Sequence, residues 1–150
     1  MTPNPAYNAL YNSALIYDIA FSYRDYPHEC QMLLQWATAA RSGRPPSSSL
    51  EVAAGPADHA LTFRSSGLEA YALDLSPSMC EYAAQKSKTR GLPISIICAD
   101  MRNFRLPQPV DLAVMMLNSV AHLHTLDDLI QHLRAVAQNV VSDGVYILEV

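Results

Sequence analysis

The fold is decided by the stretch Ser49-Leu50-Glu51-Val52-Ala53-Ala54-Gly55-Pro56-Ala57-Asp58. It contains an apolar run, then a turn of small residues, and then the start of a helical pattern. A second apolar run, Ala72-Leu73-Asp74-Leu75, follows about twenty residues later and carries a carboxylate. A strand, a tight turn, a helix and a second strand with an acidic end make up the nucleotide-cofactor half of an open α/β fold. The stretch therefore predicts a cofactor site at the carboxyl ends of the strands.

Size and composition place the chain among globular single-domain proteins. It has 150 residues, of which 50% are hydrophobic and 16% are charged. A net charge of -4 disfavours a nucleic-acid partner, because domains that bind phosphates usually carry a basic face. The three cysteines form neither a disulfide framework nor a zinc pattern, and no stretch resembles a membrane span or a signal peptide. We expect a cytoplasmic protein with no membrane partner, whose oligomeric state is open.

Residues 1–48 are expected to form a helical cap and a linker. Helical spacing of apolar residues covers Ala6–Ile19 and Tyr26–Ala40. The stretch Arg41–Ser48 contains two prolines and a glycine, which end regular structure. Lys86, Lys88 and Arg90, further along the chain, are expected to lie on the solvated end of a helix.

Residues 49–150 alternate between strand and helix patterns, so they are expected to form the cofactor-binding core. Asp143-Gly144 is expected to be a turn before the last strand. The predicted strands are Leu50–Ala53, Glu69–Leu75, Ile94–Cys98, Asp111–Leu117 and Val145–Val150. The predicted helices are Asp58–Ser65, a second from Ser76-Pro77 to Gly91, and a third from Thr125 to Val140. This alternation predicts a three-layer, Rossmann-like parallel sheet with helices on both faces.

The turn around Gly55 is a poor match to a dinucleotide-binding fingerprint. That fingerprint would need glycine at Ala53, Gly55 and Asp58, and only the middle position has it. A carboxylate at the start of the helix would repel a pyrophosphate, and Pro56 removes a backbone N–H group. A nicotinamide-dependent reductase is therefore the less favoured alternative.

Four carboxylates are expected to gather at the carboxyl edge of the sheet. Glu51, Asp58, Asp74 and Asp100 each lie at the end of a predicted strand or at the helix start facing that end. Like charges at one edge repel unless a cationic or hydroxyl-rich ligand binds there. Asp74 has the position to accept hydrogen bonds from both hydroxyls of a ribose.

Several segments, taken in order, resemble the motifs of class I S-adenosylmethionine-dependent methyltransferases. They are Leu50–Ala60, Ala72–Met79, Cys98–Met101, and Val110–Val114 with Asn118-Ser119. The resemblance runs from about Tyr17 to Val150. It implies S-adenosyl-L-methionine as the cofactor and methyl transfer to a small molecule as the reaction.

The same resemblance implies a contact for each part of the cofactor. The methionine end of the cofactor would be surrounded by Glu51, Ala53, Gly55 and Ala57, and the ribose would be bound by Asp74. The adenine would lie between Leu75 and Met79, with its amino group facing Asp100 and its ring beside the Met101 backbone. Asn118 would line the cleft. The family usually has glycine at the positions of Ala53 and Ala57, and alanine is the smallest substitute. It also usually adds two strands after the fifth, so we expect a C-terminally truncated domain.

Methyl transfer from a sulfonium is an in-line displacement at an oxygen, nitrogen or carbon nucleophile, and it depends mainly on proximity and alignment. A base is needed when the nucleophile arrives protonated. His122 and Tyr23 are the candidate catalytic residues, with Tyr17 and Tyr26 in the same segment as Tyr23. No metal is expected, because His122 and His124 have no obvious carboxylate or cysteine partner. A non-catalytic module that binds S-adenosylmethionine remains the alternative.

Overall fold

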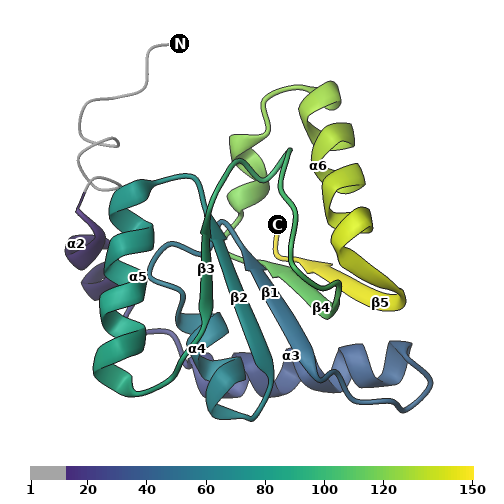
Figure 1. The fold of residues 1–150 in the computed structure, drawn as a ribbon, viewed down its shortest axis with the longest axis horizontal. Coiled ribbons are helices and arrows are strands. Elements are labelled where there is room, and N and C mark those ends of the chain that lie inside the picture. The colour runs from purple at the N-terminus through teal and green to yellow at the C-terminus, as the bar shows by residue number, and fades with distance from the viewer. Residues whose placement is uncertain (1–12) are drawn as a thin grey trace.

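Five parallel strands form the centre of the structure, a computed structural model that describes residues 13–150 (Figure 1). The strands are β1 (Ser48–Val52), β2 (Glu69–Asp74), β3 (Ser95–Cys98), β4 (Val110–Met115) and β5 (Val140–Leu148), in the order β3-β2-β1-β4-β5. Val52 lies opposite both Leu73 and Met115, so the carboxyl ends of the three central strands meet at one edge. The predicted Rossmann-like parallel sheet is confirmed.

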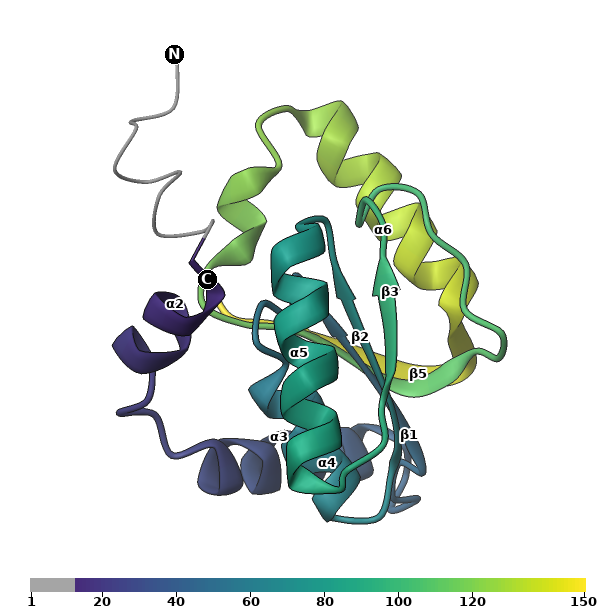
Figure 2. The same cartoon turned by 60° about the vertical axis from the view of Figure 1, so that its left-hand side comes forward.

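Helices cover both faces of this sheet. Helices α3 (Tyr26–Ala40), α4 (Asp58–Ser65) and α5 (Pro77–Arg90) share one face, and α6 (Leu126–Asn139) lies on the other (Figure 1). The short helix α2 (Ala14–Ala20) lies beside α5, as Figure 2 shows. Side chains alternate along β2: Ala70 and Ala72 pack towards α4 and α5, whereas Tyr71 and Leu73 pack on the side of α6. This alternation explains why one apolar strand can bury both of its faces.

Local sequence signals set the helix boundaries. Helix α5 begins where the Ser76 hydroxyl accepts from the Met79 N–H, and it ends at Gly91 in a left-handed conformation. Helix α6 begins with a capping box between Thr125 and Asp128. These signals are visible in the sequence, and for this reason the predicted bounds of both helices are accurate to within one or two residues.

The predicted turn at Asp143-Gly144 is wrong, because β5 continues through both residues. Val110 lies opposite Val140 but Leu112 lies opposite Val145, so β5 contains extra residues between these two pairs. A side-chain carbon at position 144 would lie within 3.0 Å of the Asp111 carbonyl oxygen. Glycine is therefore required here to let the irregular strand approach β4, and not to reverse the chain.

The N-terminal segment is only partly separate from the core. Helix α3 buries Cys30, Leu33 and Ala37 against β4 and α4, so it contributes to the sheet's own hydrophobic core. Of the predicted helix Ala6–Ile19, residues 1–12 lie outside the described part of the chain, and α2 covers the remainder. Between residues 13 and 150, no helix has the length and hydropathy needed to cross a bilayer.

Candidate cofactor site

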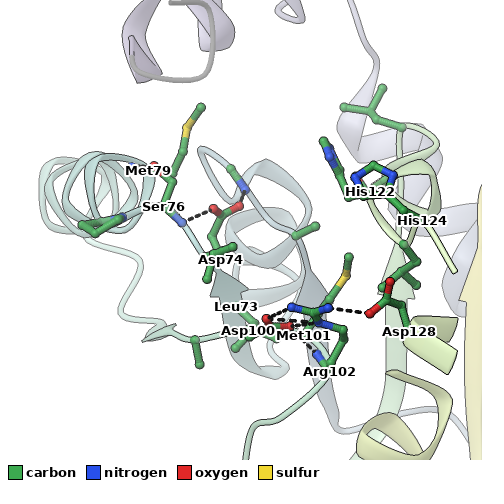
Figure 3. A pocket seen from close by; sticks show the side chains of 18 of the residues that line it. Leu73, Asp74, Ser76, Met79, Asp100, Met101, Arg102, His122, His124 and Asp128 are labelled. Carbon is green, nitrogen blue, oxygen red and sulfur yellow. Dashed lines mark hydrogen bonds and ion pairs between the residues drawn. The ribbon is translucent and has the colours of Figure 1, made fainter. Parts of the chain in front are cut away.

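A cavity of about 620 Å³ lies at the carboxyl edge of the sheet. Figure 3 shows Asp74 and Met79 on one side of it and His122, His124 and Asp128 on the other. The residues that line it are Tyr17, Ala53, Gly55, Leu73, Asp74, Leu75, Ser76, Pro77, Met79, Ala99, Asp100, Met101, Arg102, Leu117, Ser119, His122, Leu123, His124 and Asp128. The volume is in the range of small-molecule sites, and the position is that of ligand sites in open α/β sheets.

Asp74 ends β2 and faces this cavity. Its two carboxylate oxygens accept from the backbone N–H groups of Gly55 (2.7 Å) and Ser76 (2.8 Å). Burial raises the pKa of the Asp74 carboxyl above its ordinary value, although both N–H donors act in the opposite direction. Each carboxylate oxygen has a second lone pair, so a held and oriented Asp74 can still accept from ligand hydroxyls.

The turn after β1 has an unusual backbone. Ala53, Gly55 and Ala57 have φ angles of 52°, 51° and 62°, in the left-handed region that favours glycine. Each alanine in this region costs roughly 1–2 kcal/mol relative to a right-handed conformation. The Tyr17 ring would lie 3.6 Å from a side-chain carbon at position 55, so α2 comes close above the turn. The sequence indicated small side chains here but gave no sign of the left-handed angles at the two alanines.

Glu51 makes structural contacts within the fold and does not line the cavity. Its carboxylate accepts from the Ala60 N–H (2.8 Å), which belongs to the first turn of α4 and has no acceptor within the helix. It also lies 3.1 Å from Nδ1 of His59, whose Nε2 lies 2.8 Å from a Glu29 carboxylate oxygen. Burial opposes a charge on His59, but the bonds to Glu51 and Glu29 outweigh it and raise the pKa of the imidazole.

Asp58 is also satisfied from within the protein. The Lys86 ammonium lies 2.7 Å from Asp58 and 2.7 Å from Asp18 of α2. Lys86 on α5 is thus a largely covered cation, with a side chain that is 9% exposed, and it joins α2 to α4, so the expectation that it is a solvated helix-end charge is wrong. Because Lys86 compensates Asp58, the carboxylate at this helix start is a weaker argument against a pyrophosphate than the sequence indicated.

A third ion-pair network supports the loop after β4. Arg24 pairs with Glu29 (2.8 Å) and with Glu149 (2.9 Å), and the Glu149 carboxylate accepts from the Leu117 N–H (3.1 Å). Leu117 has a φ of 59° and lines the cavity. The Arg24 segment before α3 is thus connected through Glu149 to the wall of the site.

The structure brings most of the predicted site residues to the cavity. Those that line it are Ala53, Gly55, Asp74, Leu75, Met79, Asp100, Met101 and His122. Those that do not are Glu51, Ala57, Asn118 and Tyr23. Tyr23 is 77% exposed, and Tyr17 from the same segment contacts the site instead. Arg102, His124 and Asp128 were not expected to contact a cofactor, and only the sequence proximity of Arg102 to Asp100 could have indicated one of them.

Comparison with known families identifies the domain. Residues 50–144 match the family described as a methyltransferase domain. The chain belongs to this methyltransferase family. The matched segment runs from within β1 to within β5, and so it includes most of the residues around the cavity. S-adenosyl-L-methionine is the cofactor of class I methyltransferases of this kind.

Relatives and solved structures support the same assignment. A dTDP-4-amino-2,3,4,6-tetradeoxy-D-glucose N,N-dimethyltransferase from Saccharopolyspora spinosa is 31% identical over 137 residues, which cover 89% of this chain and 52% of the relative. DesVI of Streptomyces venezuelae has a TM-score of 0.81 at 26% identity over 91% of this chain and 56% of its own. CalS10, an amino pentose methyltransferase from Micromonospora echinaspora, shares the fold with a TM-score of 0.77 at 24% identity, over 89% of this chain and 55% of its own. The methyltransferase chain thus spans about half the length of these proteins.

The cavity has the chemistry that this cofactor requires. S-adenosyl-L-methionine carries a sulfonium, an ammonium and one carboxylate, so its net charge is positive. Three carboxylates, Asp74, Asp100 and Asp128, line the cavity. Among the described lining residues, Arg102 is the single lysine or arginine. Leu75, Met79 and Met101 add apolar surface suited to a base. The residues present therefore fit the cofactor.

Proposed function

We propose that this chain binds S-adenosyl-L-methionine in the cavity and forms the cofactor-binding part of a small-molecule methyltransferase. The observation that carries the proposal is Asp74, which is held at the end of β2 by two backbone N–H groups while facing the cavity. In this proposal Asp74 accepts from the ribose hydroxyls and Asp100 from the adenine amino group. Ala53 and Gly55 lie beside the methionine end, and Leu75 and Met79 beside the base.

The acceptor is proposed to be an amino group on a sugar. The curated relative is named for dimethylation of an amino sugar nucleotide, and CalS10 is named for an amino pentose. An amine attacks only as the free base, and an ammonium ion in neutral solution must first lose a proton. His122 lines the cavity wall opposite Asp74 and supplies a ring that can accept that proton or orient the amine (Figure 3).

The reaction itself requires little more than alignment. The bound cofactor supplies a methyl group already activated by its sulfonium. The chain's own contribution is to hold the adenosine through Asp74 and Asp100 and to exclude water through α2, with Tyr17 above Gly55. A cytoplasmic location belongs to the same proposal.

Calorimetry with the 150-residue chain tests the proposal. S-adenosyl-L-methionine and S-adenosyl-L-homocysteine should both give heats of binding with one site per chain, whereas NADH should give none. A methyl-transfer assay with an amino sugar nucleotide then separates an enzyme from a non-catalytic binding module. No heat with either cofactor would overturn the proposal. Binding without transfer would leave the module as the function of this chain.

A further inference from the structure

Helix α6 contacts the loop after β3 at two points that lie one helical turn apart. Asp128 and His132 are four residues apart, so they lie on the same face of the helix. Asp128 reaches this loop through Arg102, and His132 reaches it at the Met101 carbonyl oxygen (2.9 Å). Residues 100–102 of this loop, which include both contact points, line the cavity.

Arg102 connects two carboxylates on different elements. Its Nε and Nη2 donate to the two oxygens of Asp100 at 3.0 Å and 2.7 Å, and its backbone N–H donates to the same carboxylate at 2.8 Å. Its Nη1 donates to Asp128 (Figure 3). A planar guanidinium can bind one carboxylate with two parallel bonds and still reach another, which an ammonium cannot do.

Asp128 is itself held in one orientation. Its second oxygen accepts from the N–H (3.2 Å) and the hydroxyl (2.9 Å) of Thr125 in the capping box. The oxygen that faces Arg102 is therefore fixed relative to α6. The position of Asp100 thus depends on the first turn of a helix that lies 26 residues further along the chain.

The second contact strengthens the first. The Met101 carbonyl can only accept, so Nδ1 of His132 must carry the proton. Burial lowers the pKa of His132, which leaves the ring neutral and lets Nε2 accept from the Tyr146 hydroxyl at 2.6 Å. His132 is fully buried, so its contact holds the Met101 backbone from the protein interior. Arg102 holds the same loop at the protein surface.

We propose that Asp128, acting through Arg102, is a positioning residue that presents the Asp100 carboxylate to the 6-amino group of the cofactor's adenine. The proposal rests on the proposed function, because it assumes that an adenosine occupies the cavity. Asp100 takes three donors from Arg102 and lines the cavity. A carboxylate can accept about four hydrogen bonds, so Asp100 has capacity for one further donor from a ligand. With the bridge intact, Asp100 is an oriented acceptor, and it selects an amino group over a carbonyl at that position of the base.

The test compares two ligands that differ at the 6-position of the base. S-adenosyl-L-homocysteine has the amino group, and S-inosyl-L-homocysteine has a carbonyl oxygen there. The unmodified chain should prefer the adenine ligand by about tenfold or more, as expected for a hydrogen bond to a charged acceptor. Asp128→Asn, which keeps an oxygen for Thr125, should reduce that preference by roughly twofold to fivefold. Arg102→Lys should reduce it to a similar degree, because lysine cannot maintain the bidentate contact.

Two matched variants separate positioning from helix stability. Thr125→Ser keeps the hydroxyl that holds Asp128, and Asp127→Asn removes a neighbouring first-turn charge. Both should keep the adenine preference of the unmodified chain. Equal loss of preference in Asp127→Asn, or full preference in Asp128→Asn and Arg102→Lys, would overturn the inference.

The unmodified chain also distinguishes this inference from the proposed function. If it binds both ligands equally tightly, Asp100 does not contact the 6-amino group and the inference fails while cofactor binding stands. If it binds neither ligand, the proposed function fails and the inference fails with it.

Discussion

Two pairs of carboxylates that look alike in the sequence differ completely in the structure. Glu51 and Asp58 are buried beneath the turn after β1, where His59, the Ala60 N–H and Lys86 satisfy them. Asp74 and Asp100 face the cavity and are held mainly by nearby backbone N–H groups and by Arg102. All four were expected at one edge of the sheet, and only two of them line the site.

The comparison teaches that the role of a carboxylate, structural or ligand-binding, depends on which part of the chain supplies its hydrogen-bond or ion-pair partner. The cations beside Glu51 and Asp58 come from α4 and α5, so the carboxylates join elements of the fold. The donors to Asp74 come from the adjoining turn and from its own strand end, so they orient the carboxylate and leave its outer face for a ligand. Substitutions should therefore affect stability in the first pair and ligand binding in the second.

The largest effect is expected for Glu51→Ala. It leaves Nδ1 of the buried His59 ring and the Ala60 N–H without an acceptor, and removing one partner of a buried charge pair costs about 3–5 kcal/mol. Chemical denaturation should show this loss in the free energy of unfolding. Glu81→Ala, at an exposed position on α5, is the control and should change it by less than about 0.5 kcal/mol. A similar small change for Glu51→Ala would show that its contacts do not support the fold.

Asp74→Ala should mainly affect the ligand. Losing hydrogen bonds to a charged acceptor should weaken binding of S-adenosyl-L-methionine by about 1.5–3 kcal/mol, which is roughly tenfold to a hundredfold in Kd. Calorimetry measures the affinity, and circular dichroism checks that the variant is folded. An unchanged Kd in a folded variant would place the ribose elsewhere.

The pH dependence of stability should reveal His59. Its pKa in the folded chain is raised above 6.5, so its contribution is complete below that pH and is lost as pH rises through the raised pKa. The decline in unfolding free energy should not exceed about 1.4 kcal/mol per pH unit for one proton.

The variants His59→Gln and His28→Gln separate this effect from other titrations. His59→Gln should remove the decline, while His28→Gln, at an exposed position of α3, should keep it. Denaturation curves between pH 6 and pH 9 make the comparison. A decline that persists in His59→Gln would assign it to another group.

The smallest effect is expected for Arg90→Ala. Arg90 lies 3.6 Å from the same Asp58 oxygen that Lys86 contacts, but its side chain is 48% exposed. Exposed ion pairs contribute about 0–1 kcal/mol, so the free energy of unfolding should fall by no more than that. Lys86→Met should lose distinctly more, because it leaves Asp18 and Asp58 without their shared cation. Equal losses would remove the distinction between buried and exposed partners.

The fold was largely predictable because its signals are local. Ser76-Pro77 and Gly91 mark the ends of α5, and apolar runs mark the five strands. Asp143-Gly144 was wrongly predicted to be a turn because the pair is typical of turns. The reason that it is not one lies elsewhere in the chain, since Arg41 donates to the Asp143 carbonyl (3.3 Å) and to the Asp111 carboxylate (2.7 Å).

The site was predictable where the chain itself brings residues together. Asp74 and Gly55 follow from the strand-turn-helix order, and Met79 was implied by the resemblance to the methyltransferase family. Lys86, Arg102 and Asp128 could not be assigned, because the contacts that join them to other elements span 26 or more residues and depend on how the helices pack. Tyr17 rather than Tyr23 contacts the site, and apolar spacing in α2 does not distinguish between them.

The irregularity in β5 acts as a spacer. Val110 pairs with Val140 and Leu112 with Val145, so β5 advances five residues while β4 advances two. The three extra residues draw the rest of the strand back by about 10 Å along β4. Glu149 consequently stops beside Leu117, where its carboxylate can support the wall of the cavity. A deletion of residues 141–143 would move Glu149 past that wall. The number of residues in a distant surface segment therefore determines whether Glu149 can contact Leu117 at the site.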